Sequence, residues 1–466
     1  MKKLFLNTKK LDERAIDLGL SNEILMENAA NALSKHICKH IKKGSKILAI
    51  AGKGNNAADA IAALRILAKK YKCEVYLHFD ELNDMSKFQL NAAQNFGVKI
   101  SKDLSTALKG TKCVIDGLFG SGLNKNLNQK EVEIINRLNR FKSYKIACDI
   151  PSGLNESGQI LGACFKADTT ITMGAPKLGL YSDFAKDFVG HIKVADLGIS
   201  RANFEGMADG YLLTKKELKL PFRTRKNTNK GDFGHAAFIS GTFNGACELA
   251  ALAASSIGAG LVSIISQKPL ALDASIMQTT KITPKMNVVA LSMGLCENDI
   301  NNIDFKSLKD KKLVIDASLC RSDKIFDILN KKCVLTPHPA EFCSLLSMAN
   351  IADLSTKQLQ NERFKYAKIW SEKFNGVLVL KGANTIIAKN GRLFILAKGT
   401  SLLAKGGSGD VLSGLIAGLL AQGFNPLRAA ITATLAHAQA ARNFKANSYA
   451  LTPHDIIKGV KWLKNA

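Results

Sequence analysis

The sequence predicts an α/β protein built from two domains, and three observations support this prediction. At 466 residues the chain is too long for one typical domain, and 46% of its residues are apolar, which is enough to build two cores. Short apolar strands alternate with helical patterns through both halves, which is typical of parallel, doubly wound sheets. A polar stretch from Leu213 to Asn229, rich in Lys and Arg, separates the halves as a linker would.

Composition and charge narrow the classes of partner. The formal net charge is +26, but the lysines are spread along the chain without a basic tract, so the charge favours phosphorylated small molecules over nucleic acid. No signal peptide is visible, and the uncharged run Leu249–Ser266 is broken by glycines, which indicates a helix, a turn and a buried strand. The ten cysteines are scattered, as is typical of thiols in a reducing cytosol. We therefore expect a cytoplasmic protein without nucleic acid or membrane partners.

In the first half, an amphipathic helical pattern over residues 11 to 42 precedes the first predicted strand, Lys46–Gly52, which runs into the loop GKGNNAAD and a helix through Ile61. Strands separated by helices predict a parallel sheet. The further strands expected in this half are Glu74–Phe79, Cys113–Leu118, Lys145–Cys148, Thr169–Met173 and Ile192–Val194.

Three polar loops follow strands of this half: GKGNNAAD, DGLFGSGLN from Asp116, and DIPSGLN from Asp149. Because ligands bind beyond the carboxyl ends of parallel strands, we expect these loops to form one crevice. Asn56, Asp116 and Ser152 offer only oxygen ligands, which suits an alkali or alkaline-earth cation. The alternative is that these are ordinary turn residues, and the recurrence after three strands favours a site.

The second half predicts another sheet of the same kind. A strand at His235–Ile239 leads through a glycine-bearing loop into a helix from about Gly245, and Asn390-Gly391 predicts a hairpin turn. The last helix is predicted to begin at Asn425-Pro426 and to run through His437. The other strands expected are Val288–Leu291, Leu313–Ile315, Cys333–Leu335 and Gly376–Leu380.

Several polar residues follow these strands, namely Asp316, His338 and Glu341. His338 is held between two prolines, where it either donates to a ligand or satisfies a loop carbonyl. His437 lies on an alanine-rich helix face and is interpreted as a packed residue.

The most distinctive stretch is GGSGDVLSG, from Gly406 to Gly414. Its glycines let backbone N–H groups converge, and apolar residues follow at helical spacing, so a glycine-rich turn opens a buried helix. Such a helix start suits a phosphate or an oxyanion. Asp410 at this start either caps the helix or takes a proton from a hydroxyl while a phosphoryl group is held.

Together these motifs resemble those of the bifunctional NAD(P)H-hydrate repair enzymes. The resemblance rests on MENAA, GKGNNAAD, VIDGLFGSG, DIPSGLN and PKLG in the first half, and on NKGDFGHA, GTFNGA, TPHPAE, LKGANT and GGSGDVLSG in the second. It implies a Rossmann-like NAD(P)HX epimerase domain over 1–212, a linker over 213–229 and a ribokinase-like dehydratase domain over 230–466. The first would interconvert R- and S-NAD(P)HX, and the second would convert the S epimer to NADH or NADPH with ADP, giving AMP and phosphate.

The resemblance also implies site residues, with Asp149 and Asp410 as catalytic groups. In the first domain the expected substrate-binding residues are Asn55, Asn56, Ala57, Ala58, Asp59, Gly120, Ser121, Gly122, Leu123, Asn124, Lys125, Asn126 and Asp149, and the expected K⁺ ligands are Asn56, Asp116 and Ser152. In the second domain the expected substrate-binding residues are Ala246, Gly294, His338 and Asp410, and the expected nucleotide-binding residues are Lys381, Gly382, Ala383, Asn384, Thr385 and Gly409. Mg²⁺ is expected in the second domain, with ADP as co-substrate and further copies of the chain as partners.

The sequence departs from the family pattern in two places. Ala57, Ala58 and Ala60 stand where glycines are usual, and each methyl group would obstruct a pyrophosphate if φ is positive there. In the second domain, LSMGLCEN leaves Gly294 as the only glycine of a substrate loop. The alternative function is a ribokinase-like small-molecule kinase that uses ATP, with a non-catalytic N-terminal scaffold domain.

Overall fold

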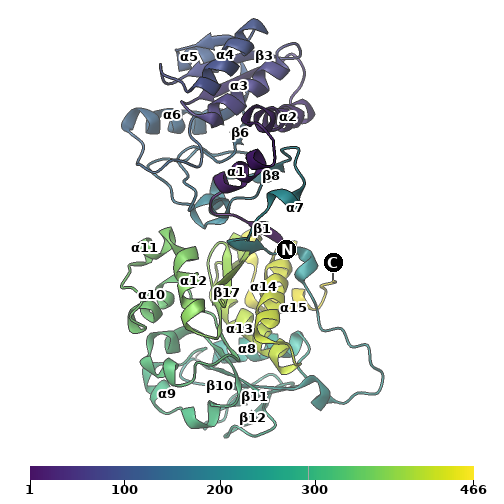
Figure 1. Cartoon of the computed structure of the whole chain (residues 1–466). Coiled ribbons are helices and arrows are strands. Elements are labelled where there is room, and N and C mark those ends of the chain that lie inside the picture. Colours follow the sequence, from purple (N-terminus) through teal and green to yellow (C-terminus); the bar gives the residue numbers. More distant parts are fainter. Residues whose placement is uncertain (292, 466) are drawn as a thin grey trace. The chain divides into compact units, whose positions relative to one another are not determined.

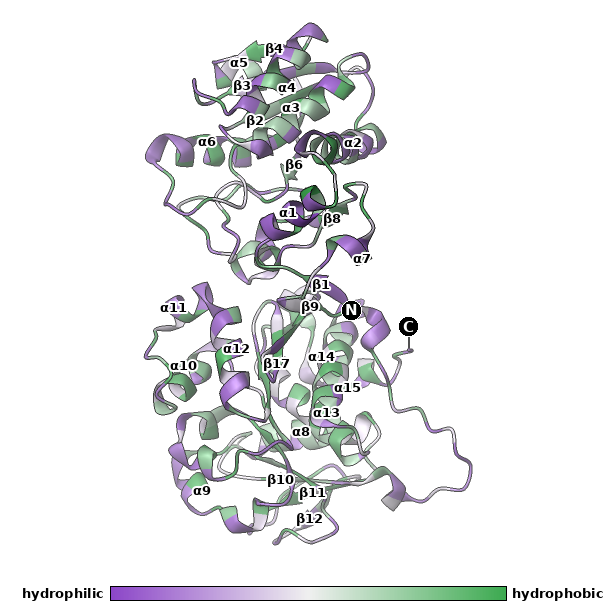
Figure 2. Ribbon diagram, in the orientation of Figure 1, coloured by the Kyte–Doolittle hydropathy of each residue, from purple (hydrophilic) through white to green (hydrophobic). Residues whose placement is uncertain are grey.

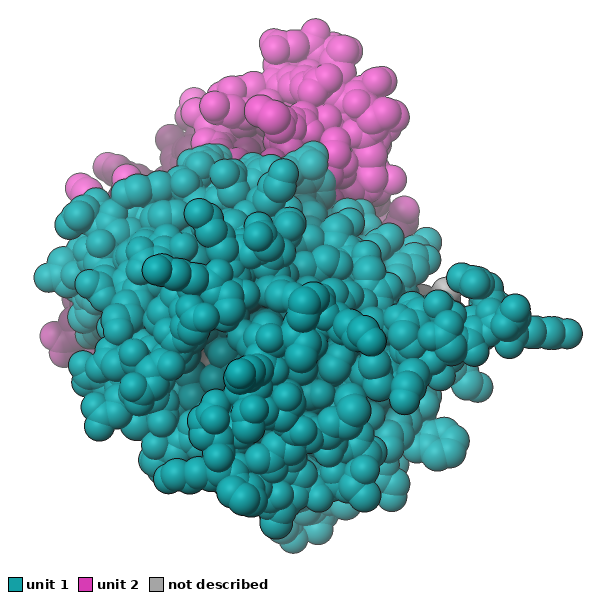
Figure 3. Space-filling model, turned by 90° about the horizontal axis from the view of Figure 1, so that it is seen from below, with its two compact units in different colours: residues 1–2, 210–466 teal, residues 3–209 magenta. Residues whose placement is uncertain are grey.

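A computed structural model describes residues 1–291 and 293–465 of the chain. It divides into two compact units (Figure 3), an N-terminal unit of Lys3–Asp209 and a C-terminal unit of Met1–Lys2 and Gly210–Ala466. The second unit begins before the predicted linker because Gly210–Leu212 forms a strand, β9, that pairs with a strand of the C-terminal sheet.

The N-terminal unit, drawn in purple to teal in Figure 1, contains a seven-stranded sheet. Its order is β4-β3-β2-β5-β6-β7-β8, with every neighbouring pair parallel. Ile47, Ala49 and Ala51 of β2 pack into one core cluster, and Leu48 and Ile50 into another, as the alternation of side chains along a strand requires. The doubly wound sheet predicted from the sequence is confirmed. Its strands are β2 (Lys46–Ala51), β3 (Lys72–Leu77), β4 (Lys99–Ser101), β5 (Thr111–Gly117), β6 (Tyr144–Cys148), β7 (Thr169–Met173) and β8 (His191–Ala195).

The helical pattern over residues 11 to 42 forms two helices in the structure. Gly19 has φ +96° and ends the first helix, and the hydroxyl of Ser21 accepts a hydrogen bond from the backbone N–H of Ile24 and caps the second. The helices of this unit are α1 (Lys9–Asp17), α2 (Asn22–His40), α3 (Asn55–Leu67), α4 (Asp84–Asn95), α5 (Leu104–Leu108), α6 (Gln129–Arg140) and α7 (Arg201–Phe204).

The second sheet has eleven strands in the order β1-β9-β18-β17-β16-β15-β14-β13-β10-β11-β12. From β16 to β12 all neighbours are parallel, and the predicted hairpin at Asn390-Gly391 joins the antiparallel strands β17 and β18. The strands are β1 (Lys2–Leu4), β9 (Gly210–Leu212), β10 (His235–Ile239), β11 (Leu261–Ile265), β12 (Met277–Thr279), β13 (Val288–Leu291), β14 (Lys312–Ile315), β15 (Cys333–Leu335), β16 (Val377–Leu380), β17 (Thr385–Lys389) and β18 (Arg392–Leu396).

Helix α13 (Ser408–Ala421) is the buried helix predicted after the glycine-rich turn. Every residue from Val411 to Ala421 is buried, and the helix is largely green in the hydropathy colouring of Figure 2. It packs directly on α8 (Asn244–Ser256), because a Cβ atom built on Gly414 would lie 2.0 Å from the carbonyl oxygen of Ala250. Glycine therefore permits this close helix crossing.

The prediction that the helix beginning at Asn425-Pro426 is the last one is wrong. That helix is α14 (Pro426–Arg442), and α15 (Pro453–Val460) follows it, capped by Thr452. The short α15 packs on α14, so it depends on a tertiary contact. The remaining helices are α9 (Glu297–Asn301), α10 (Pro339–Met348), α11 (Thr356–Asn361) and α12 (Arg363–Lys373). Among the described residues, no helix combines the length and the apolar character needed to cross a membrane.

Candidate active sites

The loops that follow β2, β5 and β6 meet at one end of the N-terminal sheet, because these strands are neighbours. The side-chain amide of Asn56, in the first turn of α3, donates to the carbonyl oxygen of Phe119 at 2.8 Å. The backbone N–H of Phe119 donates to the hydroxyl of Ser152 at 2.8 Å, and that hydroxyl donates to Asp116 at 2.5 Å. A continuous path of hydrogen bonds thus connects the three predicted K⁺ ligands.

Two features of this group fit a bound cation. The Oδ1 atom of Asn56 is buried and has no hydrogen-bond partner in the described part of the chain. Burial raises the pKa of Asp116 to about 6, although hydrogen bonds from Ser152 and Leu118 lower it. A hard cation would satisfy the amide oxygen and favour the ionised carboxylate.

Beside this group lies a buried ion pair. The side chain of Lys177 is 2% exposed, and its Nζ lies 2.5 Å from Oδ1 of Asp149 and 3.3 Å from the hydroxyl of Thr172. Asp149 has φ +64°, a left-handed conformation that is uncommon outside glycine, and also accepts a hydrogen bond from the backbone N–H of Met173. The fold therefore holds this carboxylate in a strained and defined position.

Two further carboxyl groups face this ion pair. Burial raises the pKa of Asp12 to about 6, which the Lys177 ammonium opposes and the Asp149 charge reinforces. Burial and then the Asp149 charge raise the pKa of Asp59 well above its usual value. Three carboxyl groups thus surround one ammonium group, and the raised pKa of Asp59 favours the protonated form of that carboxyl group.

Sequence reasoning predicted Asp59 and Asp149 as site residues but missed Asp12 and Lys177. Lys177 belongs to the PKLG motif, which was the available signal. Asp12 lies in α1, far from the other residues in sequence, and only the fold brings it to them.

The other predicted residues of the first site are distributed between the buried groups and an exposed rim. Gly120 lies against Asn56, since a Cβ atom at Gly120 would be 3.3 Å from the Cβ of Asn56. Asn55 is exposed, and its Oδ1 accepts a hydrogen bond from Asn83. The following residues of the loop before α6 lie at the surface or half-buried, and no hydrogen bond joins them to the buried groups in the described part of the chain: Ser121, Gly122, Leu123, Asn124, Lys125 and Asn126.

The alanines that replace the usual glycines cause no backbone strain. None of the three alanines, Ala57, Ala58 and Ala60, has a positive φ, and all of them lie within α3. All three are fully buried, and the methyl groups of Ala57 and Ala60 belong to a hydrophobic core cluster. The condition under which they would obstruct a ligand is therefore not met.

A second buried network lies at the carboxyl ends of β14, β15 and β16. Asp316, which follows β14, accepts a hydrogen bond from Lys381 Nζ at 2.7 Å and one from the hydroxyl of Ser413 at 2.9 Å. Burial lowers the pKa of Lys381, but the charges of Asp316 and Glu341 outweigh this effect and raise the pKa above its usual value. A charged ammonium group is therefore held at this edge of the sheet.

The glycine-rich turn lies beside this ammonium group. A Cβ atom at Gly409 would be 3.4 Å from Lys381 Nζ, and Gly407 has φ +85°, which favours glycine. Asp410 stands half-buried in the first turn of α13. Burial raises its pKa to about 6, the Asp316 charge reinforces this, and Lys381 lowers it. The arrangement combines a base with backbone N–H groups and a cation, which suits transfer of a phosphoryl group.

Two buried residues that sequence reasoning did not assign to the site hold its loops. The guanidinium group of Arg363 donates to the carbonyl oxygens of Leu380, Lys381 and Asn384, so it fixes the predicted nucleotide loop 381–385. His437 is buried as predicted, and its Nε2 lies 3.0 Å from the carbonyl oxygen of Ser408 at the start of α13.

The structure shows a role of His338 that the sequence did not predict, and its contact with a ligand stays a prediction. Its Nδ1 accepts hydrogen bonds from the backbone N–H groups of Ala340 and Glu341, and its Nε2 lies 3.0 Å from the Glu341 carboxylate. The imidazole therefore caps α10, and its exposed portion is what remains available to a ligand.

Ala246 and Gly294 are brought close to each other. The backbone N–H of Phe243 donates to the carbonyl oxygen of Gly294 at 2.9 Å, and Phe243 directly precedes α8, whose first turn contains Ala246. Gly294 has φ +76°, and a Cβ atom there would lie 2.1 Å from the carbonyl oxygen of Phe243. This glycine is therefore required by the contact between the two loops.

Residues 22–179 match the family model described as YjeF-related protein N-terminus, and residues 236–461 match the model described as NAD(P)H-hydrate dehydratase. The bifunctional NAD(P)H-hydrate repair enzyme Nnr of Helicobacter pylori is 41% identical over 97% of this chain and 98% of its own length. The enzyme of the same name from Coxiella burnetii is 31% identical over 93% of this chain and 92% of its own. A solved structure titled as an ADP/ATP-dependent NAD(P)H-hydrate dehydratase from Bacillus subtilis, co-crystallised with ATP and Mg²⁺, covers 54% of this chain and 96% of its own, at 25% identity and a TM-score of 0.45.

Proposed function

The chain belongs to the family of bifunctional NAD(P)H-hydrate repair enzymes, a lyase and an isomerase in one polypeptide, and from this premise we propose how its two sites divide the reaction. The N-terminal domain interconverts R- and S-NAD(P)HX, and the C-terminal domain dehydrates the S epimer to NADH or NADPH with ADP. The observation that carries the proposal is the position of Asp410 beside the Lys381–Asp316 ion pair and the glycine-rich turn.

Dehydration needs a better leaving group than water. The hydrate carries a hydroxyl on the ring carbon next to nitrogen, and Asp410 takes the proton of that hydroxyl as its oxygen attacks the terminal phosphoryl group of ADP. The bond from that phosphorus to AMP breaks. The bond between the ring carbon and this oxygen, which now carries the phosphoryl group, then breaks with push from the ring nitrogen, and loss of a proton from the adjacent carbon restores the double bond. The products are NADH or NADPH, AMP, phosphate and a proton.

The surrounding residues have positioning and electrostatic roles. Lys381 and the backbone N–H groups at Gly409 stabilise the charge that develops on the transferring phosphoryl group. Residues 381–385 contact the nucleotide, held in place by Arg363. Ala246, Gly294 and the exposed edge of His338 contact the dinucleotide.

The described residues do not form a protein site for Mg²⁺. No group of three or more His, Cys, Asp and Glu side chains could hold a metal ion there, and the carboxylates of Asp316 and Glu341 already have partners. We therefore assign Mg²⁺ only to the phosphates of the nucleotide and derive no step through it.

In the N-terminal domain, Asp149 assists the ring opening and reclosing that exchange the epimers. Its ion pair with Lys177 holds its carboxylate in place, and the raised pKa of Asp59 makes this neighbour a proton donor. The residues present fit K⁺, which Asn56, Asp116 and Ser152 would hold; bound there, the ion would fix the three loops by its charge.

The test is recovery of the reduced-nicotinamide absorbance from purified S-NADHX with ADP, then with ATP, and then from an R,S mixture with ADP. Recovery with the S epimer supports the dehydratase assignment, and prompt recovery of the whole mixture supports the epimerase assignment. A phosphorylated small-molecule product made with ATP, and no recovery under either nucleotide, would favour the kinase alternative.

We also propose a cytoplasmic location and a homo-oligomeric state. The location is supported by the ten cysteines, which are all free and mostly buried. Analytical ultracentrifugation of the purified chain checks the oligomeric state, and a single species at the monomer mass would contradict it.

A further inference from the structure

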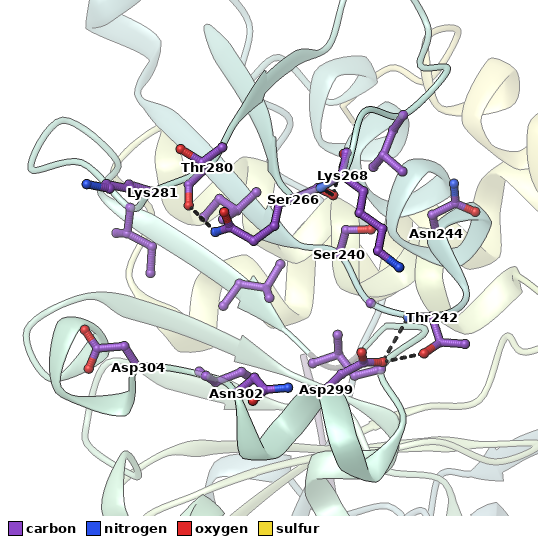
Figure 4. Close-up of a pocket in the computed structure, with 18 of the residues that line it drawn as sticks. Ser240, Thr242, Asn244, Ser266, Lys268, Thr280, Lys281, Asp299, Asn302 and Asp304 are labelled. Carbon is purple, nitrogen blue, oxygen red and sulfur yellow. Dashed lines mark hydrogen bonds between the residues drawn. The ribbon is translucent and has the colours of Figure 1, made fainter.

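A cavity of about 950 Å³ lies at the carboxyl ends of β10, β11 and β12 (Figure 4). Its walls are formed by the residues that directly follow these strands and by the segment from Leu295 to Ser307. Its volume is at the upper end of the range of small-molecule sites, about 300–1,000 Å³. None of the residues assigned above to substrate, nucleotide or metal lines it.

The sheet order relates this cavity to the reaction site. Asp316 and Lys381 follow β14 and β16, whereas the cavity lies over β10, β11 and β12, on the same edge of the parallel sheet. Three strand spacings separate β14 from β11, which is about 14 Å. The predicted nucleotide loop lies on the β16 side of Asp316. A dinucleotide whose ring reaches Asp410 therefore has to extend the other way, past β13 and β10.

The loops between the two places are those that contain Gly294 and Ala246. Leu295 and Asn244, their neighbours in sequence, line the cavity. The loop before α8 is tied to α9, because the carboxylate of Asp299 accepts hydrogen bonds from the backbone N–H and the hydroxyl of Thr242, each at 2.9 Å. The cavity wall on this side is therefore preformed.

The ammonium group of Lys268 faces the cavity. Lys268, just beyond β11, extends from one wall toward Thr242 and Asn244 (Figure 4), and its Nζ makes no hydrogen bond or ion pair within residues 1–291 and 293–465. The nearby carboxylate of Asp299 is already occupied by Thr242 and Cys296. Lys281 also lines the cavity, but Figure 4 shows its side chain pointing away from the interior.

We propose that this cavity takes the phosphate-bearing half of the hydrated dinucleotide that lies farthest from the reacting ring, and that Lys268 pairs with a phosphate group there. The inference rests on the proposed function and deepens it by naming a substrate-binding residue. The phosphate is either the pyrophosphate, present in both NADHX and NADPHX, or the 2′-phosphate, present only in NADPHX.

The first experiment measures kcat and KM of the full chain for S-NADHX and S-NADPHX at saturating ADP, with Lys268→Ala and with Lys281→Ala as the matched control. Because the phosphate would lose a charge-assisted contact, Lys268→Ala is expected to raise KM about tenfold or more with kcat unchanged. A rise for both substrates assigns the pyrophosphate, and a rise for NADPHX alone assigns the 2′-phosphate. An unchanged KM for both, or an equal rise in Lys281→Ala, would overturn the proposal.

The second experiment separates this proposal from the proposed function. Calorimetric titration of the full chain with unhydrated NADPH needs no turnover, and Lys268→Glu is expected to remove one of the binding events seen in the unsubstituted chain. If that event disappears in a chain that cannot dehydrate the hydrate, the cavity assignment stands and the proposed function fails. If the chain dehydrates the hydrate but Lys268→Glu binds NADPH as before, the cavity assignment fails.

Discussion

Asp410 combines a half-buried carboxylate with a neighbouring ammonium group, and the balance between burial and charge sets its pKa to about 6. A base must be deprotonated to act, so the group is active above this pH and inactive below it. The dehydration rate of the unsubstituted chain is expected to fall as the pH is lowered through about 6, measured as initial rates with S-NADHX and ADP.

The substitution Asp410→Asn removes the base and keeps the shape of the side chain. We expect the dehydration rate to fall about 10²–10⁴-fold with ADP affinity retained, measured by turnover and by calorimetric titration. The acid limb of the pH profile should also disappear. Turnover equal to that of the unsubstituted chain would remove Asp410 from the mechanism.

Lys177 forms an ion pair with Asp149 and holds its carboxylate in place. In Lys177→Met we expect epimerisation to fall by about two orders of magnitude, because the half-buried carboxylate of Asp149 then loses the ammonium group that orients it. The readout is the conversion of R- to S-NADHX, coupled to dehydration of the S epimer by an excess of Asp149→Ala, which is expected to keep the dehydratase activity and lack the epimerase activity. Dehydration of the S epimer by the same variant should be unchanged, which separates this effect from unfolding, and Lys166→Met on the surface of the same domain is the control.

The N-terminal residue motifs could be interpreted from sequence, but their partners could not. Asn56, Asp116 and Ser152 follow separate strands, and the rule that parallel strands end at one edge was enough to group them. Lys177, Asp12, Arg363 and His437 acquire their roles from contacts across the fold, and the sequence spacing of such residues is arbitrary.

At the scale of the elements, the crossing of α13 and α8 positions the glycine-rich turn. Gly414→Ala is expected to lower the free energy of unfolding by about 1–3 kcal/mol, since the added methyl group overlaps the backbone of α8. Chemical denaturation measures it. The control is Gly245→Ala, where no atom lies within 4 Å of the new methyl group, so the free energy of unfolding should not fall. An equal loss of stability in both variants would contradict the argument.

The loop 381–385 depends on α12 through Arg363. In Arg363→Lys the hydrogen bonds to Leu380, Lys381 and Asn384 cannot all be made, so the loop becomes less ordered. We expect KM for ADP to rise about tenfold, with KM for S-NADHX changed much less. Steady-state kinetics with each substrate varied in turn measures both, and an equal rise in the two KM values would indicate a general disturbance of the domain.

At the scale of the whole molecule, the two units each have their own sheet and core, so the two reactions should be separable. With an R,S mixture and ADP, Asp410→Asn is expected to recover no NADH, and Asp149→Ala only the S fraction beyond spontaneous epimerisation. Mixing the two variants should restore complete recovery. If the mixture recovers only the S fraction, as Asp149→Ala does alone, the N-terminal unit of Asp410→Asn does not epimerise the hydrate, and the two reactions would not be separable in this way.

The sequence by itself determined the order of the buried strands and the helices between them, because a strand covered on both faces is an uninterrupted apolar run. His235–Ile239, Val288–Leu291 and Cys333–Leu335 were predicted with the bounds that the structure has. It also determined the family, since motifs such as GGSGD and DIPSG require particular residues at particular spacing. The short strands β9 and β12 were not predicted, because their order comes from hydrogen bonds to β18 and β11 and not from their own side chains.

Only the tertiary structure decided which charges meet. It placed four carboxyl and ammonium groups from α1, α3, the end of β6 and the PKLG turn around one buried point, where low polarity makes their mutual effects large. It likewise decided that Ala57 and Ala60 face the core, that His338 caps its own helix and that Lys268 faces a cavity. These outcomes depend on direction and burial, which are properties of the packed fold and are not encoded in the spacing of residues along the chain.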